Sequence, residues 1–184
     1  MGVESSRLAV VPIGVDETLF RPLPDVARVP GRLMTTASAD VPMKGLSVLL
    51  EALAKLRVEH PHAHLVVIGR LKDESAVPQL ISDLGLDGAV EFVSGVSDQR
   101  IVELYAEAEI AVVPSLYEGF SLPAVEAMAC GVPVVATTGG ALPEVVGVDG
   151  DTARTVAPGD PSALTSAIAG LLSDDLTRAR IAAA

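Results

Sequence analysis

The sequence predicts an α/β domain in which helices cover both faces of a parallel sheet. Its short runs of Val and Ile are apolar on both faces, which is typical of strands buried in a parallel sheet. Segments with helical periodicity separate these runs, so strand and helix alternate along the chain as in βαβ units. The length of 184 residues suits one domain, and the 49% of hydrophobic residues indicates a folded chain.

Five segments have the composition of strands. The clearest are HLVVIG, VEFVS, IAVVP and VPVVAT, whereas GRLMTTAS is a weaker case. Joined by right-handed crossovers, they are expected to form a doubly wound, Rossmann-like sheet. The predicted strands are residues 31–38, 64–69, 90–94, 110–114 and 132–137.

Five main helices are expected between and after these strands. The first has leucines at helical spacing, and Asp98 and Asp160 stand where N-caps are favoured. The predicted helices are residues 44–57, 74–84, 98–108, 121–129 and 161–172. Residues 1–30 contain four prolines and little periodicity, so we interpret them as an interdomain linker and residues 31–184 as the domain itself.

Composition excludes several classes of protein. The net charge is 13 − 24 = −11, which argues against a nucleic-acid binder and against docking on anionic lipid. One cysteine excludes an intrachain disulfide and a multi-cysteine metal site. No apolar run is long enough for a membrane span, and the first residues lack the features of a signal peptide, so a cytoplasmic location is expected. The alternating His60, His62 and His64 fit a surface turn better than a metal site.

The carboxyl ends of the strands are where an open parallel sheet binds ligands. The first strand is not followed by G-x-G-x-x-G, and the chain has no P-loop motif. Residues 114–146 are the most informative segment, since Glu118 lies in a loop and Glu126 in the next helix, on either side of the helix start. Free N–H groups there favour a phosphate, and the two carboxylates could accept hydrogen bonds from sugar hydroxyls.

That arrangement suits a nucleotide-sugar, which has a diphosphate between two sugars. The spacing alone fits a simpler interpretation equally well. In that case Glu118 is a solvated loop residue and Glu126 is a glutamate favoured by the helix dipole.

The segment EGFSLPAVEAMACGVPVVAT resembles the donor-binding domain of GT-B glycosyltransferases, specifically the retaining family 4. It contains the E-x(7)-E pattern of that family as Glu118 and Glu126. The resemblance extends along nearly the whole chain. VVPIGVDETLFRP is similar to the segment that enters the second GT-B domain, and VPMKGLSVLLEALAKL to its lysine loop and helix. HLVVIGR, VEFVSGVSD and VELYAEAEIAVVPS resemble its middle, and GALPEVV and VAPGDPSALTSAI its end.

The resemblance implies a role for each matching residue. Glu118 and Lys44 are the implied catalytic residues, with Glu118 on hydroxyls of the transferred sugar and Lys44 on the diphosphate. Glu126 is expected to bind the ribose. The backbone of the turn before the helix would hold sugar and phosphate, and the loop after the third strand would face the base; these donor-binding residues are Gly119, Phe120, Ser121, Leu122, Gly95 and Val96. No metal or other cofactor is implied, because cations and a helix terminus stabilise the leaving group.

Three positions differ from the usual family pattern. Ser38 stands where the family has an arginine six residues before the lysine, and Arg70 is the candidate replacement, so both are included among the donor-binding residues. Ile13 replaces an asparagine in the segment that enters the domain. Ala153 replaces a glycine near its end.

A GT-B enzyme has two Rossmann-like domains with the active site between them, and this sequence matches the second. We therefore expect the partner to be an N-terminal acceptor domain that is absent here, and the chain alone to be inactive. The predicted function is donor binding in a retaining enzyme that transfers a hexosyl group. The alternative is a stand-alone nucleotide or sugar-phosphate binding module without transfer activity; the donor and acceptor stay open.

Overall fold

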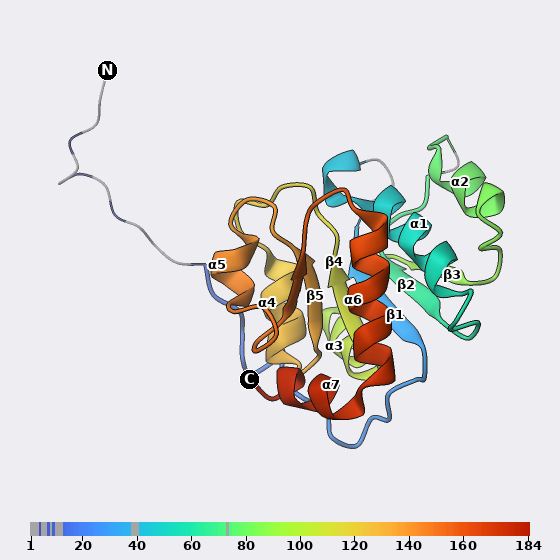
Figure 1. The fold of residues 1–184 in the computed structure, drawn as a ribbon. Coiled ribbons are helices and arrows are strands. Elements are labelled where there is room, and N and C mark those ends of the chain that lie inside the picture. The colour runs from blue at the N-terminus through green and yellow to red at the C-terminus, as the bar shows by residue number, and fades with distance from the viewer. Residues whose placement is uncertain (1–3, 5–6, 8, 10–12, 38–40, 73) are drawn as a thin grey trace.

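The computed structural model is an α/β domain in which one sheet lies between two layers of helices (Figure 1). It describes residues 4, 7, 9, 13–37, 41–72 and 74–184. In this part of the chain, six parallel strands form one sheet in the order β3-β2-β1-β4-β5-β6. The order reverses between β1 and β4, so the predicted doubly wound, Rossmann-like fold is confirmed.

Five of the six strands coincide with the predicted segments. The sixth is β6, which was not predicted because its three residues, RTV, contain no apolar run and are only half-buried. It pairs with β5 at the sheet edge through Val135–Arg154 and the two following pairs. The strands are β1 (Arg32–Thr36), β2 (His64–Ile68), β3 (Val90–Val93), β4 (Ile110–Val113), β5 (Val134–Thr137) and β6 (Arg154–Val156).

The helices also follow the prediction, apart from their starts. Asp160 caps α6 by accepting hydrogen bonds from the N–H groups of Ser162 and Ala163 at 2.9 Å. Ser97, not Asp98, is the N-cap of α3. Two helices, α5 and α7, are not among the five main helices predicted. The helices are α1 (Leu46–Leu56), α2 (Val77–Asp83), α3 (Asp98–Glu107), α4 (Leu122–Ala129), α5 (Leu142–Val146), α6 (Pro161–Ser173) and α7 (Asp175–Ala182), with a 3-10 turn η2 (Pro42–Lys44) before α1.

Lys44 does not open a helix, contrary to the prediction. It ends the turn η2, and the next residue, Gly45, adopts the left-handed conformation with φ +66°. Helix α1 begins only at Leu46. Lys44 therefore lies in a loop between β1 and α1, where its side chain is free to point across the edge of the sheet.

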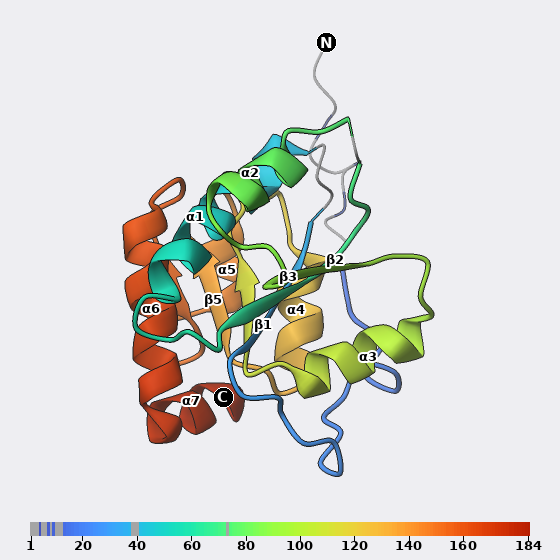
Figure 2. The ribbon, with the colours of Figure 1, turned by 90° about the vertical axis from the view of Figure 1, so that its right-hand side faces the viewer.

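Helices pack on both faces of the sheet, with one apolar core on each side. Helices α1, α2 and α6 cover one face, and α3, α4 and α5 cover the other (Figure 2). Successive strand residues point to opposite cores, as Leu33 and Met34 of β1 show. The sheet is thus buried on both faces, and the loops at its two edges carry the polar chemistry.

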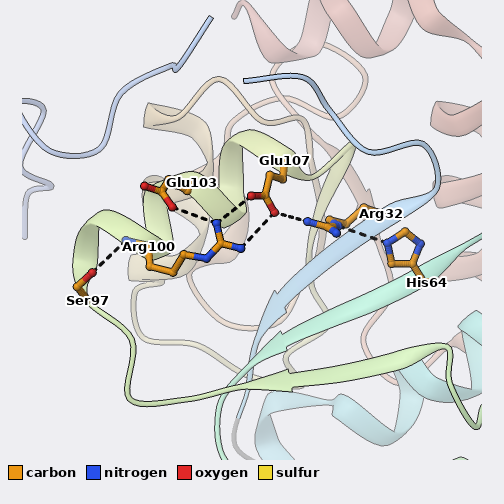
Figure 3. Close-up of polar contacts among 6 residues, drawn as sticks. All are labelled: Arg32, His64, Ser97, Arg100, Glu103 and Glu107. Carbon is orange, nitrogen blue, oxygen red and sulfur yellow. Dashed lines mark hydrogen bonds and ion pairs between the residues drawn. The ribbon is translucent and has the colours of Figure 1, made fainter. Parts of the chain in front are cut away.

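An ion-pair network lies at the amino-terminal ends of the strands (Figure 3). Arg32 of β1 pairs with Glu107 of α3, whose other oxygen accepts from Arg100 at 2.8 Å. The Nε–H of Arg32 donates to Nε2 of His64 at 3.3 Å, and Nδ1 of His64 lies 3.1 Å from the His62 carbonyl. His64 of β2 thus links that strand to Arg32 of β1.

In the described part of the chain, no helix is long and apolar enough to cross a membrane.

At the opposite edge, three loops meet in what we call the three-loop contact, formed by residues 41–45, 114–121 and 137–141. The Leu116 N–H donates to the Met43 carbonyl at 2.8 Å, and the Ala141 N–H donates to the Glu118 carbonyl at 2.8 Å. Two glycines allow this approach. A Cβ on Gly45 would lie 2.0 Å from the Pro114 oxygen, and one on Gly140 would lie 2.2 Å from the Glu118 oxygen.

We predict that Gly45→Ala destabilises the protein far more than Gly85→Ala. Both glycines are left-handed, at φ +66° and +65°, but nothing lies within 4 Å of a Cβ on Gly85. Gly85→Ala should therefore lower the free energy of unfolding by only the backbone cost of about 1–2 kcal/mol. Gly45→Ala adds a clash with backbone. Urea unfolding of both variants measures the difference, and equal losses would contradict a close contact at Gly45.

Candidate functional site

Lys44 and Glu118 form an ion pair at the carboxyl edge of the sheet. The ammonium Nζ lies 2.7 Å from Oε1 of Glu118, and the two side chains are 34% and 13% exposed. They come from the loops after β1 and β4, which are neighbours in the sheet. The three-loop contact therefore brings together Lys44 and Glu118, the two residues that the family resemblance implies are catalytic, although they are far apart along the chain.

The start of α4 follows Glu118 in the chain and contains an unsatisfied polar atom. Ser121 occupies the N-cap position, but its side chain makes no capping hydrogen bond. The residue is 3% exposed, and its Oγ has no partner among the described residues. Gly119 is exposed, Phe120 half-buried and Leu122 45% exposed, so the helix start is open to solvent on one side. An oxygen-rich anion bound here would meet both the helix N–H groups and this hydroxyl.

Glu126 is the fifth residue of α4, half-buried beside the hydroxyl of Tyr105. The Tyr105 oxygen lies 3.2 Å from Oε2 of Glu126 and 3.2 Å from the Pro123 carbonyl. Burial raises the pKa of Glu126, and the negative charge of Asp98 raises it further, while the bond to Tyr105 opposes the shift. A position this far into the helix does not fit the simpler interpretation, in which a first-turn glutamate only complements the dipole.

The third part of the site is a pocket of about 470 Å³ beyond β2 and β3. Its lining includes Arg70, Gly95 and Val96, so the structure brings together three of the predicted donor-binding residues. Arg70 is exposed and makes no ion pair with any described residue. Ser38 lies outside the described residues, so its predicted role stays a prediction.

Three polar residues of this edge were not singled out from the sequence. Ser115 donates to Glu118, Thr137 donates to the Ser115 carbonyl, and Tyr105 contacts Glu126. The only signal for Ser115 and Thr137 was their position at the ends of buried strands, and Tyr105 within its helix had none. Among the described residues, no three His, Cys, Asp or Glu side chains form a group that could hold a metal ion.

Comparison with solved structures defines the class of domain. The C-terminal domain of a glycosyl transferase group 1 family protein from Francisella tularensis superposes with a TM-score of 0.80 at 30% identity, covering 92% of this chain and 93% of that one. The Anabaena HepE protein in complex with UDP gives a TM-score of 0.80 at 28% identity, with 92% and 49% covered. The fold is therefore that of the C-terminal domain of a GT-B glycosyltransferase.

The chain belongs to the family described as glycosyl transferases group 1, whose model matches residues 28–184. It is 51% identical to the MMP alpha-(1->4)-mannosyltransferase of Mycolicibacterium hassiacum over 92% of this chain and 41% of that protein. It is 35% identical to the D-inositol 3-phosphate glycosyltransferase of Acidothermus cellulolyticus over 95% of this chain and 42% of that protein. The chain thus spans about two fifths of the length of these relatives.

We predict that Glu126→Gln raises the melting temperature at pH 7, and that the gain shrinks toward pH 4. The pKa of Glu126 is raised above its ordinary value of 4.5 in the fold, so the unfolded chain releases this proton more readily. Its contribution to stability is therefore complete below pH 4.5 and is lost as the pH rises through the folded pKa. The amide cannot ionise and escapes that loss.

The matched control is Glu51→Gln, which makes the same change on the exposed face of α1. Thermal unfolding of the three proteins between pH 4 and 8 compares them. A wild type at least as stable as Glu126→Gln at pH 7 would show that burial does not disfavour this carboxylate.

Proposed function

We propose that this chain is the donor-binding domain of a retaining family 4 glycosyltransferase, which binds a nucleotide-diphosphate-sugar and helps to transfer its hexosyl group to an acceptor. The observation that supports it best is the half-buried Lys44–Glu118 pair, whose Glu118 stands just before the start of α4 and its unpartnered Ser121 hydroxyl. A cation, free N–H groups and an orphan hydroxyl suit the diphosphate, and the carboxylate suits sugar hydroxyls.

In this proposal Lys44 and α4 share the diphosphate. An ammonium has three donors, so Lys44 can keep one on Glu118 and direct others to phosphate oxygens. The helix start supplies backbone N–H groups, and the turn Gly119–Phe120–Ser121–Leu122 holds phosphate and sugar. As the glycosidic bond breaks, negative charge grows on the leaving diphosphate, and these fixed donors stabilise it without reorganising.

The nucleoside end of the donor lies on the other side of α4 in this proposal. Glu126 accepts hydrogen bonds from the ribose hydroxyls, with Tyr105 behind it. Gly95 and Val96 face the base across the pocket after β3. Arg70 lines the same pocket and takes the role of the arginine that Ser38 replaces. The relatives support this class of ligand, since one is a mannosyltransferase and the Anabaena structure contains UDP.

The remaining parts of the proposal concern the whole enzyme. Retention of configuration fits a front-face route in which a diphosphate oxygen takes the proton of the acceptor. We propose that no metal ion takes part. The acceptor would be held by an N-terminal domain across the cleft, so this chain alone binds the donor without transferring it. The cytoplasmic location stays a prediction.

We predict that UDP, GDP or ADP binds this chain and that EDTA leaves the affinity unchanged. The charge of the diphosphate is met by Lys44 and the start of α4, so no bridging cation is needed. Isothermal calorimetry with UDP, GDP and ADP, each with magnesium and with EDTA, measures this. Binding that disappears in EDTA would overturn the metal-independent site, and a chain that binds none of the three would overturn the proposed function.

A further inference from the structure

Ser115 is a buried hydroxyl directed at Glu118. It is the second residue after β4, is 2% exposed and donates from Oγ to Oε1 of Glu118 at 2.8 Å. The buried polar side chains among the described residues are Thr35, Ser115, Ser121 and Thr137, and the last three lie at the loops of the candidate site. Burying a hydroxyl is costly unless it has a partner, so its presence in an otherwise apolar layer requires an explanation.

A second buried hydroxyl supports the backbone of Ser115. Thr137, the last residue of β5, donates from Oγ1 to the Ser115 carbonyl at 2.5 Å and accepts from the Gly139 N–H at 3.3 Å. Thr137 is 2% exposed. The chain of bonds therefore runs from the loop after β5, through Thr137 and Ser115, to the carboxylate of Glu118.

Both donors to that carboxylate use the same oxygen. Lys44 and Ser115 each contact Oε1, at 2.7 and 2.8 Å, and no described residue hydrogen-bonds to Oε2. The terminal torsion of a glutamate is broad, so one donor alone would leave the carboxylate free to rotate. Two donors from different loops, converging on one oxygen, fix its plane and leave Oε2 as an unused acceptor.

We propose that Ser115 is a positioning residue that holds Glu118 so that Oε2 accepts a hydroxyl of the donor sugar, with Thr137 fixing Ser115 in turn. The inference rests on the proposed function and adds the residues that orient the sugar-binding carboxylate. Its consequence is that losing the Ser115 hydroxyl should weaken binding of the sugar but not of the nucleotide. Without the Ser115 hydroxyl, Lys44 still meets the diphosphate, but the sugar finds a carboxylate that is not pre-oriented.

The test compares each nucleotide-sugar with its bare nucleotide. Calorimetry with UDP-glucose against UDP, and with GDP-mannose against GDP, identifies the pair for which the wild-type chain prefers the sugar form. For that pair, Ser115→Ala should weaken nucleotide-sugar binding about fivefold to tenfold, which is the worth of one typical intramolecular hydrogen bond. Binding of the bare nucleotide should change by less than about twofold on the same scale.

Two further variants separate positioning from general stability. Thr137→Val removes the bond to Ser115 without changing the side-chain shape and should show the same loss of preference more weakly, whereas Thr137→Ser should retain it. Thr165→Val is the matched control, because Thr165 also donates to backbone carbonyls, those of Ala52 and Pro161, but joins α6 to α1 away from the site. It should lower the melting temperature and leave both affinities unchanged.

The outcomes are distinguishable. A wild-type chain with a sugar preference that Ser115→Ala and Thr137→Val both retain overturns the inference and leaves the proposed function standing, as does an equal loss of both affinities. If Ser115→Ala does not fold, the ratio of nucleotide-sugar affinity to bare-nucleotide affinity in Thr137→Val and Thr137→Ser decides instead. A wild-type chain that binds neither nucleotide nor nucleotide-sugar overturns the proposed function and the inference with it.

Discussion

The site depends on the close approach of three backbone loops at the carboxyl edge of the sheet. Gly45 lies against Pro114, and Gly140 lies against Glu118, at distances that no side chain could occupy. Hydrogen bonds from Leu116 to Met43 and from Ala141 to Glu118 hold the same contact. The contact is possible because β1, β4 and β5 are adjacent in the doubly wound order, so their following loops leave the sheet side by side.

The polar groups gathered there remain incompletely satisfied by the protein itself. Ser121 has an unpartnered hydroxyl, Oε2 of Glu118 accepts no bond from a described residue, and burial raises the pKa of Glu126. The unpartnered hydroxyl and the buried carboxylate of Glu126 each cost stability in the free chain. A ligand with phosphate oxygens and several hydroxyls would satisfy all three, which is the physical reason for preferring a nucleotide-sugar over a smaller anion. These three groups all come from the loops and helix that follow the carboxyl ends of the strands, where a parallel sheet binds its ligand.

Much of the fold could be predicted from the sequence because periodicity reports burial directly. Runs such as HLVVIG and IAVVP are apolar on both faces, and they are central strands. β6 escaped prediction because an edge strand of RTV has no such signature. Lys44 was placed in a helix because leucine spacing starts near it, whereas the left-handed turn at Gly45 follows from a contact with Pro114, which periodicity does not encode.

The site was predictable only in part, for the same reason. Glu118, Glu126 and Lys44 belong to a recognisable pattern, whereas the ion pair between Lys44 and Glu118 appears only in the structure. Ser115 and Tyr105 act through contacts between separate elements, and a serine after a strand or a tyrosine in a helix is too common to indicate such a contact. Their partners became visible only once the loops and helices were placed.

The most direct measurement is a crystal structure of this chain with the nucleoside diphosphate that it binds most tightly. The account predicts β-phosphate oxygens within hydrogen-bond distance, about 2.7–3.2 Å, of both the Lys44 ammonium and the N–H groups at the start of α4. It also predicts that the ribose hydroxyls donate hydrogen bonds to the carboxylate of Glu126. A diphosphate bound away from α4, with the Lys44–Glu118 pair untouched, would contradict it.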